Sequence, residues 1–165
     1  TQNASTIAIT SGFSSTYDHY VLIVSHLQCS TAQGSVHVTL QFNGSYATSY
    51  EYIKYYWGTD GGSGQANSQN NSSVDIEGDW GGANGANGAK GMNMRFEIYQ
   101  PSTTTNYKYI TFDGIVSRNT ASQGHRHITG SIRSHSTAAL TGIRISPGSR
   151  TIQDGELRLY GVVKS

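Results

Sequence analysis

The sequence predicts an all-β fold, a two-sheet antiparallel β-sandwich that is jelly-roll-like in form. Polar and apolar residues alternate at period two in several separate stretches, which is typical of strands with one face in a core. Turn-forming pairs such as Asn43-Gly44 and Asp113-Gly114 lie between apolar residues, as expected for short strands joined by tight turns. Apart from a short turn expected at Ser14–Asp18, no segment has the 3.6-residue period of an amphipathic helix.

We expect about eight to ten short strands along the chain. The first contains Ile7 and Ile9. Tyr20–Val24 (YVLIV) is continuously apolar, so it is predicted to be a central strand covered on both faces. The clearest alternation lies in Val36–Phe42 and Met92–Ile98, each with its apolar residues on one face. Further strands are expected at Tyr107–Phe112, Ile128–Ile132, Ile143–Ile145, Leu157–Leu159 and Tyr160–Val163.

One segment breaks this pattern, from Gly58 to Gly91. It is dominated by Gly, Asn and Ser and is interrupted only by Val74-Asp75-Ile76 and by Trp80. Loops of this length are unusual in a compact domain and tend to be functional or disordered. We therefore predict a long Gly/Asn-rich loop excursion over residues 58–91. The sequence has no other interruption and no internal repeat, so residues 1–165 are predicted to form a single β-sandwich domain.

The bulk composition excludes several classes of protein. The net charge is only +1 and the basic residues are spread along the chain, whereas nucleic-acid-binding domains concentrate them on one face. No apolar run is long enough for a membrane span, and residues 1–10 lack the features of a signal peptide. The single cysteine, Cys29, cannot form a disulfide within the chain and is expected to be a small buried side chain. Because the chain starts at Thr1 and not at Met, we expect it to be processed or part of a longer protein.

The strongest local feature is a cluster of tyrosines that ends at Trp57, directly before the glycine-rich segment. Exposed Tyr and Trp side chains stack on sugars and anchor interfaces, because a flat apolar ring carries a polar tip. Alternatively, tyrosines simply favour strands and fill the faces of sheets. Strand alternation divides the cluster between two faces, one with Tyr50, Tyr52 and Tyr56 and the other with Ile53, Tyr55 and Trp57.

One of these two faces must be the outer one, and it could serve either as a ligand site or as a subunit interface. If a sugar is bound, we expect contributions from the aromatic residues that flank the predicted loop, which are Tyr55, Tyr56, Trp57 and Trp80.

Two groups of polar residues could bind a metal or a sugar. Asp75, Glu77 and Asp79 alternate on one strand face, and such an array could hold calcium or present two carboxylates to a glycoside. The signature spacing of a calcium loop is absent, so a solvated face on an edge strand is the favoured interpretation. His125 and His127 form a pair that could be a metal half-site, for example on the threefold axis of a trimer. Two histidines alone are a weak signal, and polar surface is favoured there too.

No catalytic motif occurs in the chain. The sequence has no GxSxG, HExxH or phosphate-binding loop and no Cys–His pairing in a recognisable context. The run GGANGANGAKG lacks a strand–loop–helix setting, so Lys90 is not predicted to bind phosphate. We therefore expect a protein that is not an enzyme and that uses no cofactor and no metal.

Three blocks of the chain resemble a known family. Ser5–Phe13 (STIAITSGF) and Ser15–Val21 (STYDHYV) are similar to the opening of these proteins. Ala138–Ile145 (AALTGIRI) and Asp154–Val162 (DGELRLYGV) are similar to their ending, and Phe96–Thr104 (FEIYQPSTT) to a segment between. The family comprises the virion structural and tail-fibre-like proteins of tailed bacteriophages, common in aquatic phages. The resemblance covers most of the chain outside residues 46–91. Its motifs are structural, so it implies a jelly-roll-like virion domain and no active site.

The resemblance implies a structural component of a bacteriophage virion, located at the virion surface. The preferred role is a tail-fibre or receptor-binding domain, and the second is a capsid decoration (cement) protein. The expected partners are other virion proteins, copies of the same chain in a homotrimer, and a host cell-surface glycan, but neither nucleic acid nor the interior of a membrane. The alternative is a free-standing carbohydrate-binding module of a longer secreted protein, which we would expect to be monomeric.

Overall fold

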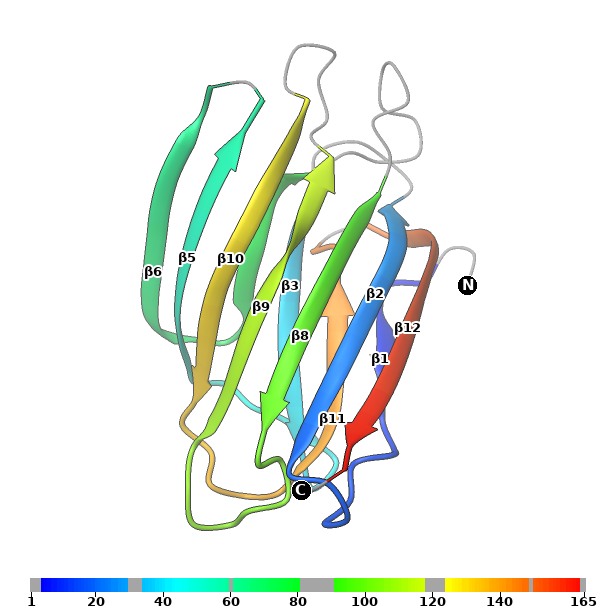
Figure 1. Cartoon of the computed structure of the whole chain (residues 1–165), viewed down its shortest axis with the longest axis vertical. Helices are drawn as coiled ribbons and strands as arrows, with labels where there is room; N and C mark the ends of the chain where they lie inside the picture. Colours follow the sequence, from blue (N-terminus) through cyan, green and yellow to red (C-terminus); the bar gives the residue numbers. More distant parts are fainter. Residues whose placement is uncertain are drawn as a thin grey trace.

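The structure is a computed structural model that describes residues 4–29, 34–59, 61–80, 91–117, 124–148 and 150–163. For residues 34, 35 and 77–80 it describes the backbone alone. Within these ranges the chain forms strands that are arranged in two antiparallel sheets, and the sheets pack against each other (Figure 1). The predicted two-sheet β-sandwich is confirmed.

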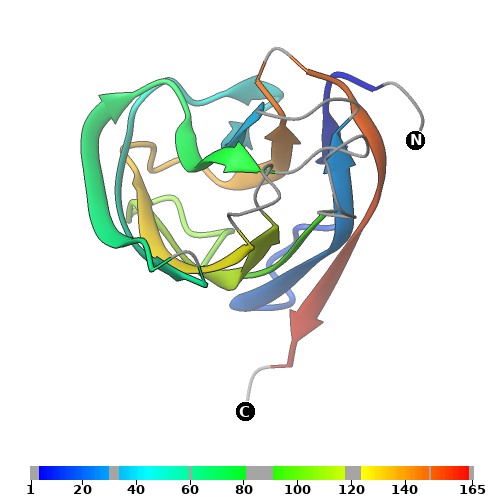
Figure 2. The ribbon, with the colours of Figure 1, turned by 90° about the horizontal axis from the view of Figure 1, so that it is seen from above.

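A larger sheet forms the front layer in Figure 1 and a smaller sheet lies behind it. Figure 2 shows the larger sheet curving around the smaller one, so that the outer face of the larger sheet is convex. In spatial order the larger sheet contains β12 (Ile152–Val162), β2 (His19–Cys29), β8 (Met92–Tyr99), β9 (Lys108–Ser117), β10 (His125–Ser134), β5 (Tyr50–Gly58) and β6 (Ser63–Asn71). The smaller sheet contains β1 (Ile7–Ile9), β11 (Leu140–Ser146) and β3 (Gly34–Phe42), and β4 (Ser45–Tyr46) and β7 (Val74–Trp80) both pair with β3.

The core fills the space between the sheets, where the sequence alternation places it. The side chains of β8 alternate strictly between buried and solvent-facing positions, because only one face of the strand meets the other sheet. Within Tyr20–Val24, Val21 is 8% exposed although it faces away from the core, since β2 lies between β12 and β8. β2 is an interior strand, as predicted, but the prediction that both of its faces are covered is wrong, because Ile23 on its outward face is partly exposed and lines a surface depression. Cys29 is buried, as the sequence predicts.

The prediction of a long loop over residues 58–91 is wrong for about half of that segment. β6 and β7 both lie in it, β6 pairing with β5 and β7 pairing with β3. The sequence of β6 (SGQANSQNN) has no apolar alternation, because an edge strand with two largely exposed faces gains its stability from the backbone ladder to its neighbour. Tertiary pairing thus overrides a sequence that is typical of a loop. Residues 81–90, which complete the predicted excursion, lie outside the described residues.

The two predicted turns have different outcomes. Asn43-Gly44 forms the turn between β3 and β4, with both residues at positive φ. Asp113-Gly114 instead lies inside β9. A Cβ atom on Gly114 would come within 2.3 Å of the backbone oxygen of Asn93 and 2.4 Å of the sulfur of Met94. This glycine is therefore needed because β8 packs closely against it.

Tyr50 links the two sheets across the core. Its ring is carried by β5, and its hydroxyl accepts a hydrogen bond from the Leu40 N–H of β3 at 2.6 Å. The same hydroxyl donates to the Leu40 carbonyl oxygen at 3.3 Å. The side chain is fully buried, and burial raises the pKa of the Tyr50 hydroxyl to about 12, although the hydrogen bond from Leu40 acts in the opposite direction.

We expect Tyr50→Phe to lower the free energy of unfolding by about 1–2 kcal/mol at neutral pH, because the Leu40 N–H is then buried without this acceptor. Above pH 10 the unfolded chain loses the Tyr50 proton, whereas the native state keeps it up to about pH 12. Through that range this group lowers the stability of the native protein by about 1.4 kcal/mol per pH unit. The phenylalanine variant lacks this contribution.

Urea unfolding of both proteins at neutral pH and at about pH 11 measures the two effects of this substitution. If the free energy of unfolding falls by the same amount between the two pH values in the unmodified chain and in Tyr50→Phe, the assignment of the raised pKa to Tyr50 is wrong.

Candidate functional site

The exposed aromatic side chains of the described residues gather at one surface, the outer face of the larger sheet. Five of them stand at outward positions of β5, β8, β9 and β12, and a sixth immediately precedes β9. Each has more than 40% of its surface exposed. A concentration of large exposed rings on one face of a domain marks a surface that binds a ligand or a partner. The six are Tyr55, Trp57, Tyr99, Tyr107, Tyr109 and Tyr160.

One aromatic group lies at the upper end of this face in Figure 1, where β5 ends and β10 begins. Strand register aligns Trp57 of β5, His127 of β10 and Ile115 of β9 across the sheet, and we call these three residues the upper cluster. The rings of Trp57 and His127 are 4.4 Å apart at an interplanar angle of 60°. His127 Nε2 lies 3.0 Å from Asp113 Oδ2, so a carboxylate orients the imidazole. Trp57 is supported on one side yet remains 49% exposed.

A second aromatic group lies at the opposite end of the same strands. Register aligns Tyr109 of β9, Tyr99 of β8 and His19 of β2, and we call these the lower row. The rings of His19 and Tyr99 are stacked, 4.9 Å apart at 6°, and His19 Nε2 is 2.8 Å from Glu97 Oε2. Burial alone would raise the pKa of Glu97, but the hydrogen bond and charge of Arg95 and the charge of His19 lower it overall. The Glu97 carboxylate is therefore ionised, and its contact with His19 holds that imidazole in place in the lower row.

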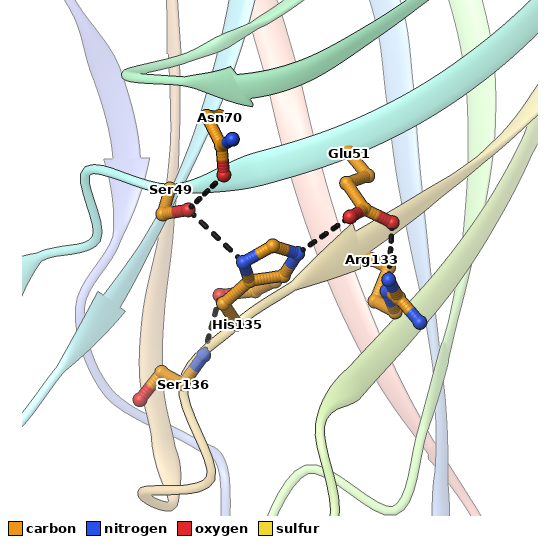
Figure 3. Close-up of polar contacts among 7 residues, drawn as sticks. Ser49, Glu51, Asn70, Arg133, His135 and Ser136 are labelled. Atoms are coloured by element: carbon orange, nitrogen blue, oxygen red, sulfur yellow. Dashed lines mark hydrogen bonds and ion pairs between the residues drawn. The ribbon is translucent and has the colours of Figure 1, made fainter.

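A polar network centred on Glu51 lies beside the lower row (Figure 3). Arg133 forms an ion pair with Glu51, and His135 Nε2 is 2.9 Å from Glu51 Oε1. The other ring nitrogen of His135 lies 3.1 Å from Ser49 Oγ. That hydroxyl donates to Asn70 Oδ1 at 3.4 Å. The network connects the start of β5 to the ends of β10 and β6 and holds the Glu51 carboxylate in place.

The order hydroxyl, imidazole, carboxylate is also the order used by serine nucleophiles. In this network, however, the Glu51 carboxylate is shared with Arg133, and the Ser49 hydroxyl contacts Asn70 Oδ1 as well as His135 Nδ1. We therefore interpret the network as a support that positions Glu51 and Arg133 on the outer face.

Arg133 is held on its other side by tyrosines. A hydrogen bond to Tyr109 raises the pKa of the Arg133 guanidinium, and Glu51 acts in the same direction. The guanidinium carbon lies 5.7 Å from the centre of the Tyr107 ring, which in turn stacks on His135 at 5.6 Å. Arg133 is thus a fixed cation that joins the Glu51 network to Tyr109 of the lower row.

The charges of this face nearly cancel. On the outward positions of β5, β8, β9 and β10 that the structure describes, Glu51 pairs with Arg133 and Glu97 with Arg95. The third acid, Asp113, contacts His127, and this contact is an ion pair only when the imidazole is protonated. Pairs of this kind near the surface contribute little to stability, but three acids against two arginines leave the face without an excess of positive charge.

Shallow depressions run along the face between the two aromatic groups. Two of them, of 240 and 430 Å³, meet at the upper cluster and share Ile115 and His127. A smaller one of 130 Å³ is lined by Thr111, Asp113 and Thr129 in the middle of the face. At the lower end, a depression of 370 Å³ lies over the Glu51 network and another of 450 Å³ lies over the lower row. Both lower depressions are lined by Tyr109.

The structure separates the four aromatic residues that the sequence grouped as a sugar site. Tyr55 and Trp57 lie together on the outer face; strand alternation predicts that they share a face but not that this face is the outer one. Tyr56 lies on the opposite side of β5, packed against the core, with the Arg126 guanidinium 4.5 Å over its ring. Trp80 is the last residue of β7, in the smaller sheet, and its side chain lies outside the described residues.

Sequence reasoning missed Tyr99, Tyr109 and Tyr160 as members of an aromatic surface. Each stands one position out of phase with the buried residues of its strand, and that is the signal which could have identified them. Alternation alone does not show that the three side chains share a face, because they come from three different strands. The pairing order of the strands provides that information.

The acidic residues of β7 serve a structural purpose where the structure describes them. Asp75 Oδ2 lies 3.7 Å from Nζ of Lys54, a lysine that is only 7% exposed. The same ammonium donates to the carbonyl oxygen of Ile76 at 3.1 Å. Asp75 therefore compensates a buried charge between the sheets. The side chains of Glu77 and Asp79 lie outside the described residues.

The two histidines of the predicted metal half-site have different surroundings. His127 belongs to the upper cluster and pairs with Asp113, while His125 is exposed at the start of β10. Within the described ranges, no group of three or more His, Cys, Asp or Glu side chains is placed to hold a metal ion.

Comparison of the chain with known protein families, with curated proteins and with solved structures finds no match in any of the three. In the described part of the chain, no helix is long and apolar enough to cross a membrane. Function is therefore inferred from the outer face of the larger sheet and from the sequence resemblance.

Proposed function

We propose that the chain is a structural surface component of a bacteriophage virion and that it binds through the outer face of the larger sheet. The preferred role is a tail-fibre or receptor-binding domain. The observation that carries the proposal is the confinement of the exposed aromatic rings to this one face, within the described residues. Aromatic anchors on one surface are the residues that dominate binding free energy in interfaces.

The face is suited to binding because its rings are already positioned. Trp57 is fixed by His127 and Tyr99 by His19, and Arg133 holds Tyr109. Side chains that are ordered before binding lose less conformational entropy when a ligand arrives. All of them stand on strands of one sheet, which is a more rigid support than a loop.

The assignment to a virion is supported by the sequence resemblance and by physical suitability. A sandwich that buries its core without a disulfide and carries few charges suits a particle surface. Many copies on one particle would let weak individual contacts act together through avidity. A capsid decoration protein would satisfy the same considerations and is the second role in this class.

The solution mass of the purified chain tests the virion proposal. Light scattering, with and without heating in detergent, is expected to show a stable trimer. A fluorescently labelled trimer is then expected to bind the surface of some strains in a panel of bacteria. A chain that is monomeric and binds no strain in the panel would contradict the receptor-binding role.

A free-standing carbohydrate-binding module is the second candidate function, and the same aromatic face favours it. Such modules act as single domains, so the chain would be monomeric and would show a measurable affinity for one sugar. The two candidates therefore differ in solution mass and not in the surface that they use.

A further inference from the structure

We infer that the outer face binds an extended, electrically neutral glycan that lies along β9 and β10, from the upper cluster to the lower row. The inference rests on the proposed binding function of this face and specifies the class of ligand. Three observations carry it: the spacing of two aromatic platforms, the polar surface between them and the balance of charge.

The two platforms are too far apart for one sugar ring. Trp57 is aligned with Ile115 on β9, and Tyr109 lies six residues before Ile115 on the same strand. At about 3.4 Å per residue the separation along the strands is about 20 Å. Trp57 is 49% exposed and Tyr109 is 50% exposed, so each offers a ring face on which the C–H face of a sugar can stack. An extended chain of sugars can contact both platforms at once.

The surface between the platforms is rich in hydrogen-bonding groups. Between the platforms, β9 and β10 place two pairs of facing residues on the outer face. The pairs are Thr111 with Ser131 and Asp113 with Thr129. Three of these residues line the depression in the middle of the face, and Ser131 lines the lower depression over the Glu51 network. Thr129 Oγ1 donates to the Phe112 carbonyl oxygen at 3.2 Å, which leaves that hydroxyl able to accept from a ligand. Sugar hydroxyls both donate and accept, so this band complements a glycan.

The balance of charge favours a neutral ligand. A polyanion would have to compete with Glu51 for Arg133 and with Glu97 for Arg95, since each of these arginines is already paired. A neutral hydroxyl can instead bind to the oxygen lone pairs that these ion pairs leave available. Recognition of an acidic polymer would require an excess of positive charge, which the two arginines and three acids of the face do not provide.

The test is affinity electrophoresis of the full chain in gels that contain one polysaccharide each. Dextran, mannan, galactan and xylan serve as neutral probes, and alginate and polygalacturonate serve as anionic probes. We expect retardation by at least one neutral polysaccharide, unchanged when salt is raised. Trp57→Ala and Tyr109→Ala are each expected to weaken that retardation about tenfold, and the double variant about a hundredfold.

Tyr46→Ala is the matched control. Tyr46 stands on β4 of the smaller sheet, away from the proposed path, and the Arg144 guanidinium lies 3.7 Å over its ring. Its removal should leave retardation unchanged. Calorimetry with oligosaccharides of the retarding polymer should give one ligand per chain. A disaccharide, which spans one platform only, should bind more weakly than an octasaccharide.

Three results would overturn the inference. One is failure of every neutral polysaccharide to retard the chain, whether or not an anionic one does so. Another is an equal effect of all three single substitutions. The third is that Trp57→Ala or Tyr109→Ala converts an oligomer to a monomer while retardation stays unchanged. That result would mean that this face is a contact between copies of the chain. Retained binding to bacterial cells in these cases would leave the proposed function standing, because cell binding and solution mass are measured separately.

Discussion

Replacement of Lys108 by methionine is expected to lower the free energy of unfolding by about 3–4 kcal/mol. Lys108 stands on the inner face of β9 with no exposed surface, and its ammonium donates to the carbonyl oxygens of Thr103, Asn106 and Thr137 at 2.8, 2.9 and 3.1 Å. Burial lowers the pKa of the Lys108 ammonium, so these three bonds must offset the cost of removing the charge from water. Methionine has a similar length but no donor, and all three carbonyl groups would lose this partner.

Lys54→Met provides the matched control for that prediction. Lys54 is also buried, but its ammonium donates to one carbonyl oxygen, that of Ile76, and lies 3.7 Å from the partly exposed Asp75. Its loss should cost about 1–2 kcal/mol. Urea unfolding of the three proteins at neutral pH makes the comparison. A smaller loss for Lys108→Met than for Lys54→Met would contradict the view that Lys108 is a structural donor joining two connecting segments.

The second large effect is expected for Gly130→Ala, at about 3 kcal/mol or more. A Cβ atom on Gly130 would lie 2.3 Å from the carbonyl oxygen of Ile53, 2.5 Å from the outermost ring carbon of Phe112 and 3.0 Å from the Cα of Lys54. Two of these three atoms belong to the backbone of β5, so the clash cannot be relieved by a change of side-chain rotamer. β10 and β5 would have to separate in the middle of their ladder, and overpacking of this kind is destabilising.

Ser131→Ala, the adjacent residue on the solvent-facing side of β10, is the control for Gly130→Ala and should change stability by less than about 0.5 kcal/mol. For a chain of this length the glycine substitution corresponds to a fall in the melting temperature of roughly 10 °C. Thermal unfolding followed by circular dichroism measures both variants. Equal melting temperatures for the two variants would show that β5 and β10 are not packed as closely as described.

The part of the fold that the sequence predicts is the part in which burial alone determines the pattern. The residues from Met92 to Ile98 alternate because one face of β8 must meet the opposite sheet, and period two is the only arrangement that achieves this. β6 has no such pattern, because its two faces are largely exposed and its partner β5 determines its conformation. The chemistry of a pair such as Asp113-Gly114 likewise does not distinguish a turn from a close approach between strands.

The candidate site, like the fold, could be predicted from the sequence only where the pattern within one strand determines it. That Tyr55 and Trp57 share one face follows from alternation within a single strand, but alternation does not show that this face is the outer one. The alignment of Trp57 with Ile115, and hence its distance from Tyr109, depends on the register of β5, β10 and β9. A shift of one residue in that register would turn Tyr109 towards the core. Local sequence patterns do not determine such a register, so the face could not be assembled from the sequence.

Masking the outer face of the larger sheet tests directly whether it is the binding surface. Because Cys29 is buried, a single introduced cysteine can be labelled selectively with polyethylene glycol maleimide. Thr111→Cys places the label in the middle of the outer face, and Ala8→Cys places it at an exposed position of β1 in the smaller sheet. We expect the label at position 111 to abolish binding to bacterial cells and to the retarding polysaccharide, and the label at position 8 to leave both unchanged. Equal binding by the two labelled proteins would contradict the assignment of function to this face.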